Sequence, residues 1–127
     1  MKQKFLKCNA CGKIMHVVKD SHIVPKCCGK DMIEIIPGTV DASVEKHLPV
    51  FEDNGGKIIV SVGSVEHPMT EEHYIQFIEV FCDDKILRKY LEPNQKPEFL
   101  IKLNGDVKYA REYCNIHGLW KGENHVN

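Results

Sequence analysis

Four cysteines near the N-terminus have the spacing of ligands to a single metal ion. Cys8 and Cys11 stand three positions apart. Cys27 and Cys28 are adjacent, and a glycine directly follows each pair. Two sulfurs on one tight turn and two on another supply the four thiolates of a tetrahedral site. Adjacent cysteines are unusual in such a site, so we expect a distorted turn at the second pair. The ligand type does not choose between iron and zinc, because four-sulfur tetrahedra suit both.

A second set of candidate metal ligands is spread over the rest of the chain. It consists of His47, His67, His73, Cys114 and His117. A single histidine in a loop is usually a surface residue. All four of these, however, stand at or near the ends of apolar runs, where the loops of a β-sandwich cluster. Pro49 and Pro68 stiffen the chain beside two of them.

Cys114 and His117 raise a separate question, because four cysteines already complete one metal site. The pair could be without function, could add ligands to the first site, or could belong to a second site. In a regular strand the two side chains would point to opposite faces. They converge only if the chain turns after Tyr113, and Gly118 favours such a turn.

The first 36 residues differ from the rest and predict a small unit that depends on metal. They contain four of the six cysteines and two short apolar runs, at 14–18 and 32–36. A segment of this size is stabilised poorly by burial alone, and a structural metal normally supplies the difference. Pro37-Gly38 then marks a linker. We therefore expect one domain over residues 1–36 and a second over 37–127.

The remainder of the chain has apolar runs of strand length separated by turn signals. The runs cover 57–63, 73–81, 85–91, 98–103 and 107–113. Asn104-Gly105 predicts a two-residue hairpin turn between the last two runs, and 53–57 predicts a second turn. A short helix over 83–92 is an alternative, although no segment keeps a long 3.6-residue period. The pattern predicts an antiparallel β-sandwich.

The composition argues against several classes of function. The chain has 127 residues, of which 43% are hydrophobic and 28% charged, and this supports a packed core rather than disorder. A formal net charge of −1 gives no overall attraction to nucleic acid or to an anionic membrane. No run approaches the ~18 apolar residues of a membrane span. The N-terminus lacks the long apolar run of a secretory signal, so we expect a cytoplasmic protein whose cysteines bind metal.

Together these motifs resemble the desulfoferrodoxin family, the two-iron form of superoxide reductase. The resemblance rests on EKHLPV at 45–50, GSVEHPMTEEHYI at 63–75 and REYCNIHGLW at 111–120, preceded by CNACG and CCGKDM. It covers almost the whole chain, and the order and spacing of nine ligands make it specific. It implies an all-β protein. A small desulforedoxin- or rubredoxin-like metal-binding domain would precede an immunoglobulin-like antiparallel β-sandwich.

The resemblance also implies the metal ligands, with two irons per chain. The residues that match the family's four-cysteine iron centre are Cys8, Cys11, Cys27 and Cys28, and zinc remains an alternative there. The residues that match the four equatorial ligands of the catalytic iron are His47, His67, His73 and His117. Cys114 matches the axial thiolate. Asp31 and Phe77 stand where the family often has proline and tryptophan, but neither is a ligand position.

The implied activity is one-electron reduction of superoxide to hydrogen peroxide, with electrons from an external donor such as rubredoxin. This activity would detoxify reactive oxygen in an anaerobe or microaerophile. Glu45 and Lys46 match the pair that precedes the first histidine ligand in the family. Lys46 would steer the superoxide anion to the open position of the iron, and Glu45 would then cap that position. The resemblance further implies a homodimer.

Two other functions fit parts of the pattern. An iron electron-transfer protein without a substrate would use the same ligands, but it gains nothing from an open coordination position. A copper site of the cupredoxin type expects a methionine soon after the Cys–His segment, and none follows Cys114. We expect Cys82 to pack as a small apolar residue and His16, His22 and His125 not to bind metal.

Overall fold

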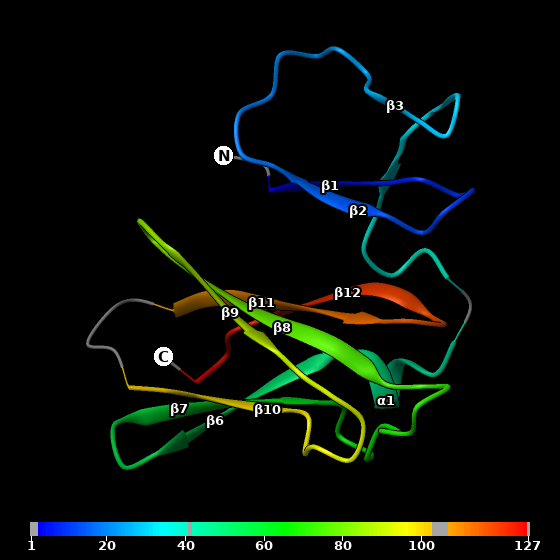
Figure 1. Cartoon of the computed structure of the whole chain (residues 1–127). Coiled ribbons are helices and arrows are strands. Elements are labelled where there is room, and N and C mark those ends of the chain that lie inside the picture. The colour runs from blue at the N-terminus through cyan, green and yellow to red at the C-terminus, as the bar shows by residue number, and fades with distance from the viewer. Residues whose placement is uncertain (1–2, 41, 103–106, 127) are drawn as a thin grey trace. The chain divides into compact units, whose positions relative to one another are not determined.

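The computed structural model of the chain describes residues 3–40, 42–102 and 107–126. The backbone divides into two compact units, Met1–Ile36 and Pro37–Asn127. Both units consist mainly of β-strands, which run from blue to cyan in the first and from green to red in the second (Figure 1). None of the helices in these described ranges is long and apolar enough to cross a membrane.

The described part of the N-terminal unit contains five short strands in two small sheets. They are β1 (Lys4–Lys7), β2 (Ile14–Val17), β3 (Lys26–Cys27), β4 (Lys30–Asp31) and β5 (Ile33–Ile35). β1 pairs antiparallel with both β2 and β5, while β3 and β4 form a hairpin. Phe5 and Met32 are almost fully buried, whereas Val18 and Ile23 are largely exposed. A core of this size gives little stability without a further link between the chain segments.

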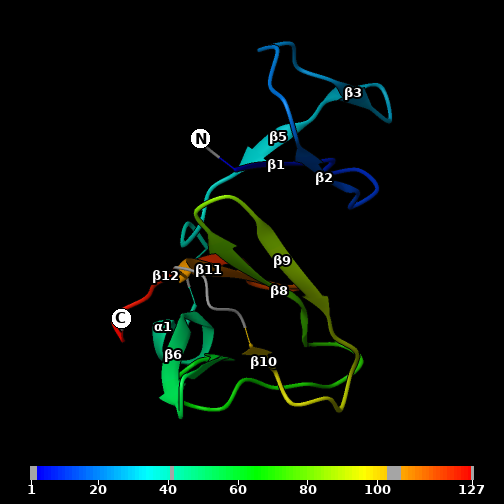
Figure 2. The same cartoon turned by 90° about the vertical axis from the view of Figure 1, so that its left-hand side faces the viewer.

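The described part of the C-terminal unit has seven strands and one turn of helix. The elements are α1 (Val44–His47), β6 (Pro49–Asn54), β7 (Lys57–Val62), β8 (Ile75–Cys82), β9 (Ile86–Tyr90), β10 (Glu98–Ile101), β11 (Val107–Cys114) and β12 (Gly118–Glu123). One antiparallel sheet has the order β10-β7-β6, and the other has the order β12-β11-β8-β9. The two sheets face each other as the layers of a sandwich (Figures 1 and 2). The predicted fold class is confirmed.

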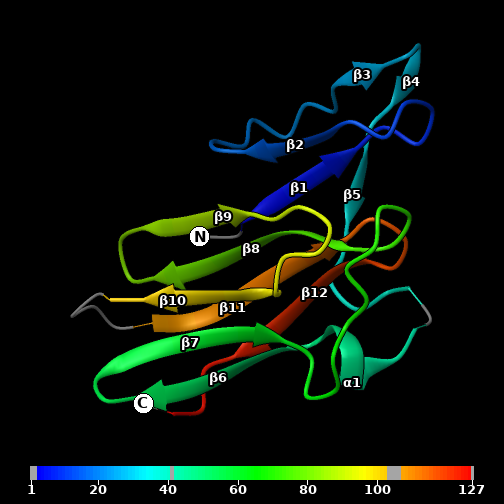
Figure 3. The ribbon, with the colours of Figure 1, turned by 60° about the horizontal axis from the view of Figure 1, so that its bottom comes forward.

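The core of the sandwich lies between the two sheets and includes the end of β11. Side chains from both layers form it: Val60, Val62 and Ile101 from one, and Ile75, Ile78, Val80, Val107, Ala110 and Cys114 from the other. Side chains two positions apart in a regular strand point to the same face, but the core residues of β11 are three and four positions apart, because its register with β8 shifts between Val107 and Tyr109 and between Tyr113 and Cys114. Figure 3 shows that β11 ends at the same end of the sandwich as α1. This end therefore gathers Cys114 and the residues of α1.

The strand run predicted at 85–91 is confirmed, and the alternative of a short helix over 83–92 is wrong. Strand β9 covers Ile86–Tyr90, which pair in register with Phe81 to Phe77 of β8. The one helix turn in the described chain lies instead at Val44–His47, which the sequence did not mark as helical. A single turn is too short to show a 3.6-residue period, so the hydrophobic pattern could not reveal it.

The hairpin expected between the last two strand runs is also corrected. β10 pairs with β7, whereas β11 pairs with β8 and β12, so β10 and β11 belong to different sheets. Asn104-Gly105 itself lies outside the described residues. The turn expected at 53–57 is confirmed: Asn54 pairs with Lys57, and the two glycines between them have φ angles of 63° and 84°. Such angles suit glycine in a tight hairpin turn.

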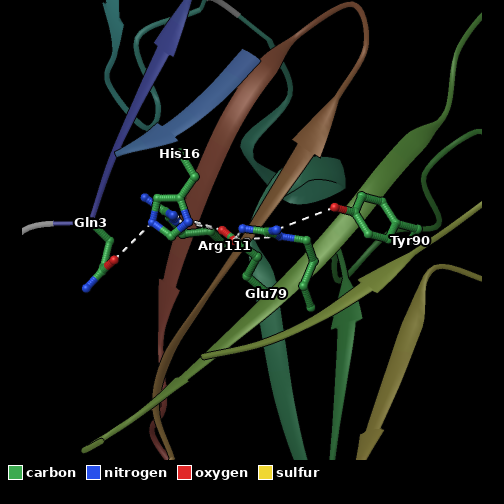
Figure 4. Close-up of polar contacts among 6 residues, drawn as sticks. Gln3, His16, Glu79, Tyr90 and Arg111 are labelled. Carbon is green, nitrogen blue, oxygen red and sulfur yellow. Dashed lines mark hydrogen bonds and ion pairs between the residues drawn. The ribbon is translucent and has the colours of Figure 1, made fainter. Parts of the chain in front are cut away.

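An ionic cluster ties three strands of the four-stranded sheet together. Glu79 on β8 has no solvent exposure and accepts hydrogen bonds from Arg88 on β9 at 2.7 Å and from Arg111 on β11 at 2.8 Å. Figure 4 shows Glu79 and Arg111 in this network beside Tyr90. The guanidinium of Arg111 also lies 4.7 Å from the ring centroid of Phe81. These bonds fix the register of β11, which carries Cys114 three residues beyond Arg111.

Candidate metal centres

The four cysteines of the N-terminal unit form one group, called here the four-cysteine site. The sulfur atoms of Cys8, Cys11, Cys27 and Cys28 all lie within 4.8 Å of one another. The Cys11 and Cys27 sulfurs are 3.7 Å apart. In a tetrahedron with metal–sulfur bonds of about 2.3 Å, neighbouring sulfurs are about 3.8 Å apart. The spacing of these thiols therefore fits a four-coordinate metal, and none of the cysteines, all of which the structure describes, forms a disulfide.

The backbone explains how adjacent cysteines reach one ion. Cys28 and Gly29 are the two central residues of the β3–β4 hairpin, and both have positive φ angles, 54° and 74°. Positive φ at both positions is the requirement for a type I′ turn. Cys28 thus accepts a conformation that residues other than glycine rarely adopt. This is the distorted turn that the sequence predicts at the second cysteine pair.

The thiol groups of the four-cysteine site compete for protons. The backbone N–H of Cys11 lowers the pKa of Cys8 to about 6. Hydrogen bonds from the Cys27 thiol to the sulfurs of Cys8 and Cys11 raise the pKa of Cys27 to about 12. Hydrogen bonding with the same two sulfurs raises the pKa of Cys28 as well. Four thiolates so close together need a cation between them, which a divalent or trivalent metal supplies.

The second group, called here the histidine–cysteine site, contains a closed ring of four imidazoles. Ring centroids are 4.7 Å apart for His47–His67 and for His67–His73, 4.9 Å for His73–His117 and 4.8 Å for His117–His47. Each ring plane is inclined by 79° to 84° to the next. The four rings therefore surround a common centre edge to face, as four imidazole ligands around one ion would.

The hydrogen bonds of His47 and His67 show that this centre suits a cation. The Nδ1 atom of His47 donates to the carbonyl of Ser43, and Nδ1 of His67 donates to the carbonyl of Pro68, both at 2.6 Å. A neutral imidazole has one ring proton. Both Nε2 atoms therefore present lone pairs, yet they face each other at 3.2 Å. Two lone pairs at this distance repel each other unless a cation lies between them.

The remaining donor atoms point to the same centre. The Nδ1 atom of His117 lies 3.1 Å from Nε2 of His47. The Nε2 atom of His73 is buried and has no hydrogen-bond partner among the described residues. Donor atoms 3.1 and 3.2 Å apart along two sides of a square would lie about 2.2 Å from its centre, close to a metal–imidazole distance of about 2.0–2.1 Å. The residues present therefore fit a metal.

Burial keeps the histidines in the neutral form that binds metal. It lowers the pKa of His67 to about 4, and it also lowers the pKa values of His47 and His73. The charge of Lys46 adds a smaller effect in the same direction on His47 and His73. At neutral pH these imidazoles are unprotonated, so no proton competes with a metal for the ring nitrogens.

Cys114 supplies the sulfur of the histidine–cysteine site. Its Sγ atom lies within 4.8 Å of donor atoms of His47, His73 and His117, and its side chain is fully buried. Burial raises the pKa of the Cys114 thiol, while the backbone N–H groups of His117 and Ile116 act in the opposite direction. The N–H of His117 donates to Sγ at 3.4 Å. Hydrogen bonds of this kind stabilise a thiolate in an apolar environment.

Three short segments bring the five side chains together. His47 is the last residue of α1, and His67 and His73 lie on the loop between β7 and β8. Cys114 ends β11, and His117 lies in the turn before β12 begins at Gly118, which has a φ angle of 80°. The turn thus comes one residue later than the sequence suggests. The register with β8 also shifts between Tyr113 and Cys114.

Glu45 and Lys46 lie on α1, directly before His47, and both are exposed. The turn after β7 holds their backbone. The N–H of Val65 donates to the carbonyl of Glu45 at 3.1 Å, and the N–H of Gly63 donates to the carbonyl of Leu48 at 2.9 Å. A Cβ atom on Gly63 would lie only 2.7 Å from the Lys46 carbonyl oxygen. This support could not be predicted from the sequence, because backbone contacts leave no side-chain motif.

The other cysteine and histidines lie outside both sites. Cys82 is partly buried and packs against the sandwich core, as expected. His16 contacts Gln3 at 3.0 Å within the N-terminal unit, which Figure 4 also shows. His22 is exposed beside Asp20, and His125 is exposed near the C-terminus.

Trp120 on β12 contacts two ligands of the histidine–cysteine site. Its indole stacks on the imidazole of His47, with centroids 5.0 Å apart, and donates to the carbonyl of His117 at 3.0 Å. Tyr113 instead stacks on Phe77. The sequence did not indicate that Trp120 contacts the metal ligands while Tyr113 packs against another aromatic ring.

Comparisons with known proteins agree with this geometry. The desulfoferrodoxin family model matches residues 39–123. A desulfoferrodoxin of Desulfarculus baarsii is 48% identical over 118 residues, which are 93% of this chain and 94% of that protein. A superoxide reductase of Pyrococcus abyssi is 36% identical over 99 residues, covering 62% of this chain and 85% of its own.

A solved structure extends the likeness to both units. The crystal structure of the superoxide reductase from Treponema pallidum covers 97% of this chain and 100% of its own, with a TM-score of 0.78 and 34% sequence identity. The four-cysteine site and the histidine–cysteine site correspond to the two iron centres of the family. The family match and these relatives place the chain in the desulfoferrodoxin family.

Proposed function

We propose that the chain is a superoxide reductase that reduces superoxide to hydrogen peroxide at the histidine–cysteine site. In this reaction superoxide takes up one electron and two protons, and no dioxygen is released. The observation that carries the proposal is the pair of Nε2 lone pairs on His47 and His67, 3.2 Å apart within a closed ring of four imidazoles. Relatives named superoxide reductase support it.

The four histidines of the ring and Cys114 would hold an iron ion that can still bind a small anion. Iron, when bound, would supply the one-electron chemistry. The five side chains would hold the iron and would leave room for one further ligand, as in catalytic metal sites. The buried Cys114 thiolate would push electron density toward the metal, as thiolates do in haem proteins. The carbonyls of Ser43 and Pro68 orient the imidazoles of His47 and His67 toward the centre of the ring.

Lys46 and Glu45 would handle the substrate and the open position. Lys46 is exposed, and its charge acts on the two ring members His47 and His73, so it lies near enough to attract an anion toward the ring. Glu45 precedes it on α1 and would cap the open position after turnover. Support for this role of Glu45 comes from the family resemblance and from its position on the same helix turn.

The remaining parts of the proposal concern electron supply, assembly and location. The four-cysteine site would hold the second iron, with zinc as the alternative, and a donor such as rubredoxin would supply electrons. Exposed Val18, Ile23 and Val24 line a hollow of about 720 Å³ in the N-terminal unit, which supports a homodimer through this surface. Two sites that use reduced cysteines as metal ligands support a cytoplasmic location. Removal of superoxide by the proposed reaction would detoxify reactive oxygen.

A pulse of superoxide mixed with the reduced, iron-loaded protein tests the function. We expect one hydrogen peroxide for each superoxide consumed, no dioxygen, and the growth of a broad long-wavelength band from the oxidised thiolate site. The variant Cys114→Ser should lose this band and the reductase activity but keep iron in the four-cysteine site. Half the peroxide with release of dioxygen would indicate dismutation. No reaction with superoxide, with reversible oxidation by other partners, would favour a simple electron-transfer protein. Zinc alone in both sites would contradict the redox proposal.

A further inference from the structure

Asn115 lies in the turn between β11 and β12 and contacts both neighbours of His73. Its Oδ1 accepts a hydrogen bond from the N–H of Tyr74 at 2.9 Å, and its Nδ2 donates to the carbonyl of Glu72 at 3.0 Å. Its own backbone N–H donates to the carbonyl of Tyr74 at 3.2 Å. One residue therefore makes three hydrogen bonds that bracket a metal ligand from a segment more than forty positions away in the chain.

His73 needs such a support because its ring has no anchor of its own. The Nδ1 atoms of His47 and His67 each donate to a backbone carbonyl. Among the described residues, His73 has no ring hydrogen bond of this kind, and its Nε2 faces the site without a partner. Its position depends on its backbone, which bonds to Thr70 on one side through two reciprocal bonds of 2.9 and 3.2 Å.

The strand ladder does not supply this support by itself. Cys114 pairs with Ile75, but the register between β11 and β8 shifts between Tyr113 and Cys114. Beyond this pair the N–H of Asn115 still donates to the Tyr74 carbonyl, but the N–H of Tyr74 and the carbonyl of Glu72 bond to the Asn115 side chain. The side-chain amide of Asn115 takes the place of the missing backbone groups, since an amide offers one acceptor and one donor in the same geometry.

We propose that Asn115 is a positioning residue of the histidine–cysteine site, which latches the His73 segment to the Cys114–His117 turn. The latch holds Nε2 of His73 at its corner of the ring and keeps the loop from moving away from the thiolate. This inference rests on the proposed function only because it takes the ring as an iron site. Loss of the Asn115 side chain should loosen the ring at His73 while the sandwich core remains packed.

Asn124 offers a matched control at the other end of the same strands. Its Nδ2 donates to the carbonyl of Val107 at 2.9 Å, and its Oδ1 accepts the N–H of Val126 at 3.0 Å. It therefore makes the same two kinds of side-chain bond as Asn115. Val107 begins β11 and Cys114 ends it, so the control removes equivalent bonds far from the metal ligands.

The test compares iron-loaded Asn115→Ala, Asn115→Asp and Asn124→Ala proteins with the unchanged chain. Loss of a residue that orients a metal ligand typically weakens metal binding ~10–100-fold. We expect Asn115→Ala to release iron from the histidine–cysteine site to a chelator about tenfold faster and to shift the long-wavelength thiolate band. Asn115→Asp keeps the acceptor for Tyr74 but places a carboxylate oxygen against the Glu72 carbonyl in place of the donor, so it should also speed iron release. Asn124→Ala should leave iron release and the band unchanged.

The outcomes separate this inference from the proposed function. Equal iron release and equal bands in Asn115→Ala and Asn124→Ala would overturn the latch, whatever their melting temperatures. If Asn115→Ala does not fold, Asn115→Asp decides on the same two readouts. An unchanged chain that binds iron but does not reduce superoxide contradicts the proposed function, and the comparison of iron release still tests the latch.

Discussion

The indole ring of Trp120 covers the imidazole of His47, with ring planes inclined by only 26°. The same indole donates its Nε1 proton to the carbonyl of His117. One aromatic side chain therefore restrains two ligands of the ring, the first by packing against its face and the second by a hydrogen bond to its backbone. Trp120 is almost fully buried, so this restraint is part of the sandwich itself.

Replacing Trp120 should separate these two contributions. Trp120→Phe keeps an aromatic face but leaves the His117 carbonyl without its donor, which costs about 1–3 kcal/mol of stability. Trp120→Ala removes the packing as well and should cost about 3–5 kcal/mol. Urea unfolding of the iron-loaded protein measures both, and the thiolate band reports the ligand geometry. Equal losses in the two variants would show that packing against His47 contributes nothing.

Glu79 should be the residue of the ionic cluster whose loss is most costly. It is fully buried between Arg88 and Arg111, and removing one partner of a buried ionic group costs about 3–5 kcal/mol. We expect Glu79→Ala to lower the free energy of unfolding by this amount. The exposed pair Lys121–Glu123, with a distance of 3.1 Å, provides the control. Glu123→Ala should cost at most about 1 kcal/mol, and a comparable cost for both variants would refute the assignment.

Lys46→Ala should slow the second-order reaction with superoxide and flatten its dependence on ionic strength. Electrostatic steering raises association rates ~10-fold or more, and salt screens it. Stopped-flow or pulse-radiolysis rates at several salt concentrations measure the effect. Lys57→Ala serves as the control, because Lys57 is an exposed lysine at the β6–β7 turn, outside the ring. If Lys46→Ala and Lys57→Ala react alike, Lys46 has no steering role.

The metal-free protein should lose stability as the pH falls from about 6.5 to about 4. Burial lowers the pKa of His67 to about 4 in the folded chain, against 6.5 for an ordinary histidine. Between these values the unfolded state binds more protons than the folded state, so the free energy of unfolding rises with pH across this window. The lowered pKa values of His47 and His73 act in the same direction. Urea midpoints of metal-free protein at several pH values measure this slope.

His67→Gln should make that slope shallower, since it removes the histidine with the most strongly lowered pKa. His22→Gln is the comparison, because His22 is exposed in the N-terminal unit. A slope that is the same in the unchanged chain and in His67→Gln would show that protonation of this ring member does not control acid stability.

Those features of the fold and of the metal sites that depend on local side chains could be predicted from the sequence. The spacing of Cys8 and Cys11, and the glycine after each cysteine pair, already indicated a metal site, because ligand type and turn chemistry are local properties. The apolar run at 73–81 predicted a strand, and the structure has β8 at Ile75–Cys82. The partners of β10 and β11 did not follow, since a short turn signal cannot tell a hairpin from a crossing between sheets.

The supports of the ring were beyond prediction for a different reason. The roles of Asn115, Gly63 and Trp120 arise from contacts with backbone groups or ligands distant in the sequence. Asparagine and glycine in a turn have many ordinary explanations, so their residue types gave no indication of these contacts. The α1 turn likewise owes its position to hydrogen bonds with the segment after β7.

The two metal sites differ in how they depend on folding. His47 and His117 are 70 positions apart in the chain, so an ion held by both crosslinks a long loop. Closing a loop costs entropy that grows with its length, and a clip across a long loop removes more of that entropy from the unfolded chain. The ring can assemble only after both sheets have paired, which makes it a late contact of high sequence separation.

In the four-cysteine site Cys8 and Cys27 are only 19 positions apart, and little core surrounds them. Metal uptake there should accompany folding, whereas metal uptake at the ring should follow it.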